Sequence, residues 1–212
     1  MVRILLIRHG FSISNKSGCL TGRLDVPLDE KGERQAELLA EYLIKNYSID
    51  AIYSSDLIRV IDTVRPLALK LCKEINALEG LRETHIGRWQ GKRISELAES
   101  EPELVEQMKE DPYNFKFPDG ECENDVFLRV SRTLDSITRE NDGHTVVVAT
   151  HGGVIRSLLR QWMKVSPDRT DLIPLVNNAS VSVIEYEKGI YTPKIIGFDG
   201  YLDGLSTAYD FK

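Results

Sequence analysis

Cysteine is scarce in this 212-residue sequence, and long apolar runs and basic runs are missing from it. The three cysteines, Cys19, Cys72 and Cys122, are odd in number and have no C-x-x-C spacing, which argues against a disulfide framework and a cysteine-rich zinc site. The amino terminus has no extended apolar stretch before a small-residue cleavage site, and no later segment is long and apolar enough to cross a bilayer. We therefore expect a cytoplasmic protein that keeps its thiols reduced and has no membrane partner.

The charge balance is acidic, with 27 Lys and Arg against 33 Asp and Glu and a formal net charge of −6. A protein that tracks nucleic acid or an anionic membrane needs a patch of Lys and Arg, and this sequence has no run that would form one. We expect no nucleic-acid partner. An anionic substrate has to be captured by a local cluster of cations.

Short apolar runs alternate along the chain with apolar residues at helical spacing. Strands are expected at residues 4–7, 50–53, 74–77, 145–149, 179–185 and 194–198. Helices are expected to end near residues 46, 72, 109, 141 and 163, and the third of them has a break near Pro102. This order predicts an α/β fold, a three-layer α/β/α sandwich with a mostly parallel central sheet. Nothing divides the chain, so residues 1–212 are expected to form one domain.

Two local features refine this prediction. Ser54, Ser55 and Asp56 are candidate N-caps of a helix that has Arg59 near its first turn and Cys72 at its end, where we expect a buried cysteine. Residues 110–124 concentrate Pro, Gly, acids and aromatics, which is typical of a loop or lid. The lid-like insertion as a whole is expected around residues 84–124, and the turn-rich last dozen residues form a tail.

Basic residues follow the apolar strands. Arg8, His9 and Gly10 come after residues 4–7, and His151 follows residues 145–149. In open α/β sheets ligands bind beyond the carboxyl ends of the strands. If these strands are parallel neighbours, both histidines converge with Arg8 and Arg59 on one side of the sheet. Arg8 and His9 can share a pocket only if the regular strand has ended by about Arg8.

Four cationic or cationisable groups around one point suit a doubly charged anion, and guanidinium groups match phosphate oxygens. The helices that start after Ser55 and Gly153 would add backbone N–H groups to the same anion. We assign His9 as a nucleophile for phosphorus, and His151 with the arginines to charge neutralisation. Glu83 is the chosen proton donor and base, although its position alone does not single it out.

Six motifs follow one another along almost the whole chain. They are R-H-G at residues 8–10 with Asn15 five positions later, T-G-R-L-D-V-P-L-D-E-K-G-E-R-Q-A at 21–36, Y-S-S-D-L-x-R at 53–59, L-R-E-x-x-x-G-x-W-x-G at 81–91, F-P-D-G-E at 117–121 and T-H-G-G-V-I-R at 150–156. In these motifs the sequence resembles the histidine phosphatase superfamily, the phosphoglycerate mutase-like group. It looks closest to the small bacterial phosphatases of that group.

The resemblance implies a phosphoglycerate mutase-like fold and a site that uses no metal and no cofactor. It implies that His9 is phosphorylated and that Glu83 is the acid and base. The remaining residues that it places around the substrate phosphate are Arg8, Asn15, Thr21, Gly22, Arg59, His151 and Gly152.

Some positions depart from the pattern of that family. Phe11 stands where Glu or Gln is usual, and Cys122 where Ser is usual. Positions beside the pocket are where specificity changes, so Phe11 is a candidate determinant of the substrate. Other candidate contacts with a substrate carboxylate are Arg23, Arg88 and Lys92, and His85 can either touch the substrate or lie on the surface.

The main expectation is a phosphatase that hydrolyses a small phosphorylated metabolite through a phosphohistidine on His9. One alternative is a phosphoglycerate mutase that depends on 2,3-bisphosphoglycerate, although residues 110–124 look short for a water-excluding lid. Another is a non-catalytic module that binds a phosphorylated ligand. The sequence leaves open which phosphomonoester is used and whether the subunit forms a homodimer.

Overall fold

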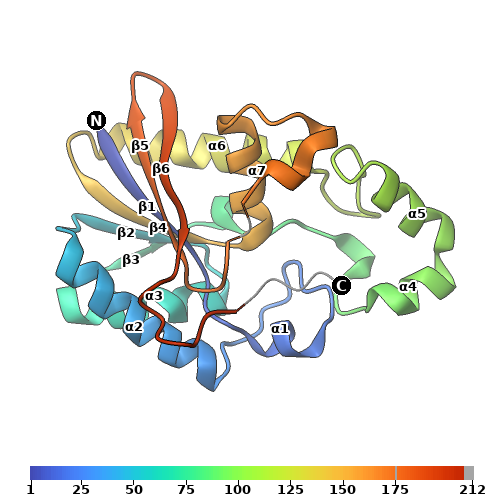
Figure 1. Cartoon of the computed structure of the whole chain (residues 1–212), viewed down its shortest axis with the longest axis horizontal. Coiled ribbons are helices and arrows are strands. Elements are labelled where there is room, and N and C mark those ends of the chain that lie inside the picture. Colours follow the sequence, from blue (N-terminus) through green and yellow to red (C-terminus); the bar gives the residue numbers. More distant parts are fainter. Residues whose placement is uncertain (175, 208–212) are drawn as a thin grey trace.

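A computed structural model describes residues 1–174 and 176–207 and shows a six-stranded sheet covered by helices (Figure 1). The strand order is β3-β2-β4-β1-β5-β6. The strands are β1 (Val2–Arg8), β2 (Ala51–Ser54), β3 (Ile75–Ala77), β4 (Thr145–Thr150), β5 (Val181–Glu187) and β6 (Ile190–Phe198). The first four in this order run parallel, whereas β5 is antiparallel to β1 and β6 is antiparallel to β5. The prediction of a mostly parallel sheet is confirmed.

Alternating side chains of β1 pack on opposite faces of the sheet. Ile4 and Leu6 belong to an apolar core with α6 (Glu123–Glu140) and α7 (Gly152–Trp162). Leu5 and Ile7 belong to a second core with α2 (Glu30–Asn46) and α3 (Ile58–Leu71). Each such fully buried side chain contributes about 1.5–3 kcal/mol through the hydrophobic effect. Strand β1 is therefore uniformly apolar because helices cover both of its faces, and the three-layer α/β/α sandwich is confirmed.

The chain between β3 and α6 forms a third, smaller cluster. Here lie η1 (Glu79–Leu81), η2 (Gly87–Trp89), α4 (Ile94–Ser100) and α5 (Pro102–Glu110). Trp89, Leu97, Val105 and Phe115 are buried together at the centre of this cluster. Pro102 stands at the first position of α5, where a missing N–H costs nothing, and this explains the predicted break between the two helices.

The structure corrects the prediction at the start of α3. The N-cap is Leu57, which is buried and makes no side-chain capping bond, and not one of the three polar residues before it. The Ile58 N–H donates instead to the Asp25 carboxylate at 2.7 Å. A carboxylate from another loop therefore accepts the hydrogen bond of a first-turn N–H, whereas local sequence reasoning expected one of the preceding residues to accept it.

One other expectation is wrong, and one helix was missed. Cys72 is exposed and ends α3 with a left-handed φ of 51°, so it is not part of the core. The short helix α1 (Ile13–Ser17), which begins with a capping box between Ser12 and Asn15, was not predicted.

The end of the chain adds the short segment η3 (Pro167–Leu172) before β5. Part of the predicted tail, residues 208–212, lies outside the described residues. Within residues 1–174 and 176–207, no helix has both the length and the apolar character needed to span a bilayer.

Candidate active site

The two predicted histidines lie at the ends of neighbouring strands. Strand β1 pairs with β4 up to Arg8 and Thr150, and the His9 N–H continues the ladder by donating to the Thr150 carbonyl at 3.0 Å. The strand ends at Arg8, as the shared pocket requires. The ring centroids of His9 and His151 are 5.3 Å apart, so the predicted convergence of the two His-Gly segments is confirmed.

The tautomer of His9 follows from its hydrogen bond. Its Nδ1 atom lies 2.7 Å from the Gly10 carbonyl oxygen, which can only accept, so Nδ1 carries the proton. The Nε2 atom then has a free lone pair. Burial, followed by the positive charges of Arg59 and Arg8, lowers the pKa of His9 well below its usual value and keeps the ring neutral.

His151 has the opposite tautomer. Arg59 Nη2 donates to its Nδ1 at 3.2 Å, so the proton sits on Nε2, which donates to Ser55 Oγ at 2.9 Å. Burial, followed by Arg59 and His9, lowers the pKa of His151 as well. The side chain is fully buried and does not line the cavity described below, which differs from its predicted place in the pocket wall. It contacts two residues that do line this cavity, His9 and Arg59.

Two arginines are fixed by backbone carbonyls. Arg59 donates to Leu24 O at 2.8 Å and to Gly22 O at 2.9 Å, and Arg8 donates to Val176 O at 2.7 Å. Both guanidinium groups are almost completely buried, which fixes two positive charges beside the neutral ring of His9. This is the local cationic cluster that an acidic protein needs in order to bind an anion.

Gly22 has a left-handed φ of 51°, and a Cβ atom there would come within 2.6 Å of Ile86. Only glycine fits this position without displacing the loop. The glycine therefore lets the loop turn its carbonyl toward Arg59.

Glu83 lies at the amino end of α7. Its Oε2 accepts from the Gly153 N–H at 3.1 Å, and its Oε1 accepts from the Thr84 N–H at 2.8 Å. A Cβ atom at Gly153 would lie 2.6 Å from Oε1, so the carboxylate reaches the helix only because residue 153 is glycine. The first-turn N–H of α7 therefore binds Glu83, whereas the sequence assigned this helix end to the anion itself.

Eight of the nine predicted site residues line one cavity of about 620 Å³. They are Arg8, His9, Asn15, Thr21, Gly22, Arg59, Glu83 and Gly152. Asn15 has its Oδ1 held by Ser12 N at 3.0 Å, which fixes the orientation of the amide. Residues far apart in the sequence thus meet at one edge of the sheet.

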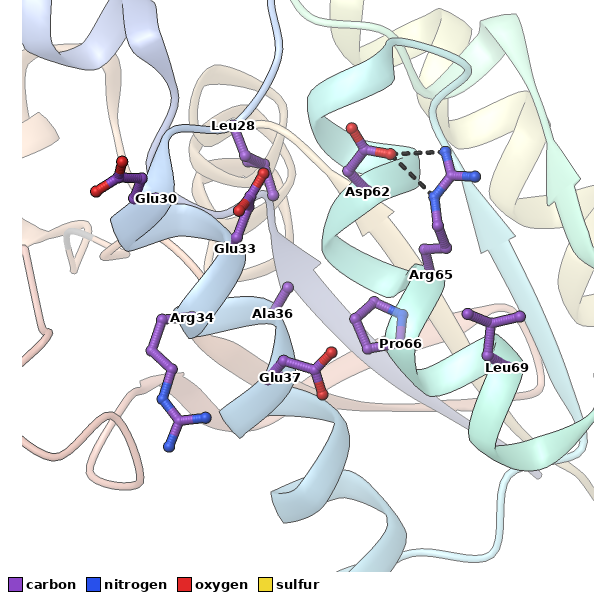
Figure 2. A pocket seen from close by; sticks show the side chains of 10 residues that line it. All are labelled: Leu28, Glu30, Glu33, Arg34, Ala36, Glu37, Asp62, Arg65, Pro66 and Leu69. Atoms are coloured by element: carbon purple, nitrogen blue, oxygen red, sulfur yellow. Dashed lines mark hydrogen bonds and ion pairs between the residues drawn. The ribbon is translucent and has the colours of Figure 1, made fainter.

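A second hollow, of about 640 Å³, lies between α2 and α3 (Figure 2). It is lined by four carboxylates and two arginines, and one of these, Arg65, is paired with Asp62; the charged residues are Glu30, Glu33, Arg34, Glu37, Asp62 and Arg65. This excess of negative charge would repel a phosphate. None of the predicted site residues belongs to this hollow.

The structure also shows polar residues that sequence reasoning missed. Thr63 Oγ1 accepts from the Gly10 N–H at 2.8 Å and donates to Arg59 O at 2.7 Å, linking the first His-Gly loop to α3. Its place one turn after Arg59 was the available signal. Asn178 Nδ2 donates to the His9 and Gly10 carbonyls at 3.0 and 3.2 Å, and no sequence signal pointed to it.

A partly buried ion network fixes the backbone beside Glu83. Glu121 accepts from Arg23 and Arg129, and these two arginines also donate to backbone carbonyls, Arg23 to Glu83 O at 3.1 Å and Arg129 to Arg82 O at 3.0 Å. Sequence reasoning missed Glu121 and Arg129. It named Arg23 as a contact for a substrate carboxylate, but Arg23 does not line the cavity.

A mostly parallel sheet with two His-Gly segments on neighbouring strand ends is typical of the phosphoglycerate mutase-like class of α/β proteins. The family model of the histidine phosphatase superfamily (branch 1) matches residues 4–197, and the chain belongs to this superfamily.

Similar proteins agree with this assignment. The chain is 34% identical over 186 residues to "Metal-independent phosphoserine phosphatase" of Arabidopsis thaliana, covering 87% of this chain and 76% of that protein. It is 32% identical to "Phosphoserine phosphatase 1" of Hydrogenobacter thermophilus, covering 89% and 88%. Among solved structures, Bacillus stearothermophilus YhfR superposes with a TM-score of 0.89 at 28% identity, covering 95% of this chain and 100% of that one.

Proposed function

We propose that this protein is a metal-independent phosphatase that hydrolyses small phosphomonoesters through a phosphohistidine on His9. The observation that carries the proposal is the hydrogen bond of His9 Nδ1 to the Gly10 carbonyl, 2.7 Å long. It leaves a lone pair on Nε2, and His9 lines the same cavity as Arg8, Arg59 and Glu83. Nucleophile, anion clamp and proton carrier therefore line the same cavity.

In the first step His9 Nε2 attacks phosphorus, the N–P bond forms and the ester P–O bond breaks. The electron pair of that bond goes to the leaving alkoxide, which takes a proton from Glu83 and departs as the alcohol. Arg8 and Arg59 stabilise the charge on the equatorial oxygens. His151 acts as a positioning residue for Arg59 through their 3.2 Å contact.

In the second step water attacks the phosphohistidine. The Glu83 carboxylate takes a proton from the water, the new O–P bond forms and the N–P bond breaks, which restores the His9 lone pair. Phosphate leaves and Glu83 is protonated again. The bonds from Thr84 and Gly153 hold the carboxylate in place through both steps.

We also propose that the substrate is a free metabolite of the cytoplasm and that neither nucleic acid nor membrane takes part. The net charge of −6 and the localised cationic cluster support this view. The free cysteines, one of them exposed, are compatible with a reducing compartment.

The test is phosphate release from a panel of phosphomonoesters in the presence of a chelator. The panel is assayed with wild type, His9→Ala and His144→Ala, which removes an exposed histidine outside the site. We expect release by wild type and His144→Ala and none by His9→Ala. Quenching in alkaline detergent during turnover should trap a phosphoryl group on the protein that is stable to base and labile to acid, as an N–P bond is.

Two outcomes would overturn the proposal. Faster interconversion of phosphoglycerates with a bisphosphate primer than release of phosphate would favour the mutase. Phosphate binding without turnover of any ester would favour the binding module.

A further inference from the structure

The wall of the cavity combines charged and apolar side chains. Among the described residues that line it, the only charged side chains are Arg8, Arg59 and Glu83, which the proposed phosphoryl transfer already uses. A separate group of lining residues is apolar. It consists of Phe11, Leu20, Ile86, Ile94 and Phe117.

Cations that could bind a carboxylate on the leaving group are engaged elsewhere. Arg88 donates to Glu101 at 2.6 Å, and Lys92 lies 3.9 Å from the same carboxylate. Arg23 is held by Glu121 and by the Glu83 carbonyl. None of these three cations lines the cavity. A leaving group with its own carboxylate would thus lose hydration without gaining a fixed counter-ion.

The apolar wall is part of a packed structure. Leu20, Ile94 and Phe117 pack against the buried cluster around Trp89, and the Phe117 ring lies 5.6 Å from Trp89 and 5.2 Å from Phe115 in edge-on contacts. Such contacts fix the ring without a ligand. The wall is therefore preformed, which favours binding of an apolar group.

Phe11 belongs to the same cavity and is anchored through its backbone. Its N–H donates to Gln35 Oε1 at 2.8 Å, and Lys31 Nζ lies 5.5 Å from its ring centroid. A Glu or Gln at this position would present a polar side chain, whereas this chain presents a ring. The departure noted in the sequence thus adds apolar surface to the pocket.

We propose that this phosphatase selects phosphomonoesters of uncharged alcohols that carry an apolar group about the size of a phenyl ring. This inference rests on the proposed function and names its substrate class. The charged residues of the cavity bind the phosphoryl group, and its apolar residues bind the alcohol. Esters with a charged leaving group, such as phosphoserine or 3-phosphoglycerate, are disfavoured.

The test compares kcat/KM of wild type for four esters of aliphatic alcohols, so that differences in alkoxide basicity stay small. They are 2-phenylethyl phosphate, glucose 6-phosphate, phosphoserine and 3-phosphoglycerate. We expect 2-phenylethyl phosphate to exceed each of the other three by about tenfold or more, the discrimination that an apolar pocket typically gives. Equal or faster turnover of any of the others overturns the inference.

A matched pair of variants locates the effect. Ile94→Asn changes the first residue of α4, which lines the cavity, and Ile190→Asn changes the first residue of β6, which is 66% exposed and does not line it. We expect Ile94→Asn to lower kcat/KM for 2-phenylethyl phosphate about fivefold to tenfold and for phosphoserine less than twofold. Equal losses for the two esters would contradict the inference.

The two proposals fail in different ways. No phosphate release from any ester would remove the proposed function and with it this inference. Release that favours phosphoserine would leave the phosphatase standing and remove only the apolar substrate class. The wild-type comparison decides this even if Ile94→Asn fails to fold.

Discussion

Gly153→Ala should separate activity from stability in this protein. Glycine at this position leaves room for the Glu83 carboxylate, because a Cβ atom would lie 2.6 Å from Oε1 while ordinary contact begins at 3.4 Å. The carboxylate has to retreat by about 0.8 Å and weaken its 3.1 Å bond from the Gly153 N–H. A shift of about 1 Å in a reacting group costs on the order of 10²-fold in rate. We expect kcat to fall by about 30-fold to 100-fold.

Stability should move the other way or stay level. Alanine is favoured over glycine in a helix by about 0.5–1 kcal/mol, and losing a hydrogen bond to a charged group costs about 1.5–3 kcal/mol only if the bond breaks completely. Urea unfolding of Gly153→Ala should therefore give a midpoint close to that of wild type. Gln161→Ala, in the same helix but away from the cavity, serves as the control and should leave both quantities unchanged.

The choice of leaving group tests which step is affected. p-Nitrophenolate leaves without protonation, so Gly153→Ala should still phosphorylate His9 quickly with p-nitrophenyl phosphate and then hydrolyse the intermediate slowly. Stopped-flow absorbance should therefore show a burst of p-nitrophenol followed by slow turnover, while the phosphoenzyme accumulates. Activity of Gly153→Ala within threefold of wild type on alkyl phosphates would refute the assignment of Glu83.

Three further predictions follow from the histidines and their partners. The pKa values of His9 and His151 are lowered in the folded state, so the unfolded chain binds more protons than the folded protein below pH 6.5. The free energy of unfolding should therefore fall by about 1.4 kcal/mol per pH unit for each histidine as the pH drops below that value. Urea unfolding at pH 7.5 and 5.5 checks this, and a midpoint that does not depend on pH contradicts it. Ser55→Ala removes the acceptor of the His151 Nε2–H, so kcat should fall about tenfold, whereas Ser100→Ala on the exposed surface should have no effect in the same assay. Vanadate at about 100 times its Kd for wild type should stabilise wild type by about 2.7 kcal/mol. At the same vanadate concentration Arg59→Lys, which cannot keep both carbonyl bonds and the anion contact, should show less than half of this stabilisation in thermal melting. An equal stabilisation of the two proteins would place the anion elsewhere.

The layers of this fold could be predicted because buried strands and helix faces have recognisable patterns of apolar residues in the sequence. Strand β1 is apolar at Ile4, Leu5, Leu6 and Ile7, which is how a strand covered on both faces reads, and the helices show their buried faces at helical spacing. The N-cap of α3 could not be predicted in this way. The N–H of Ile58, the first residue of the helix, is satisfied by Asp25, a residue 33 positions away, and no local pattern contains that information.

The same limit applies to the candidate site. Arg8, His9 and Arg59 stand next to strand ends or helix starts, so the order of the elements was enough to bring them together. Asn178 contributes because the loop before β5 returns beside the first His-Gly loop, where its side chain donates to the His9 and Gly10 carbonyls. Such long-range contacts depend on the tertiary path of the chain.

The two His-Gly segments show why residue type alone could not assign the roles. Both histidines are buried, neutral and next to Arg59, and both follow a strand of the same parallel pair. Their partners decide the difference, because a carbonyl oxygen at His9 Nδ1 frees Nε2, whereas the Arg59 donor at His151 Nδ1 forces the proton onto Nε2 and toward Ser55. Exchanging the acceptor and the donor would exchange the tautomers. The nucleophile is therefore set by one backbone carbonyl and one guanidinium group, and of the two histidines His9 is the one that lines the cavity.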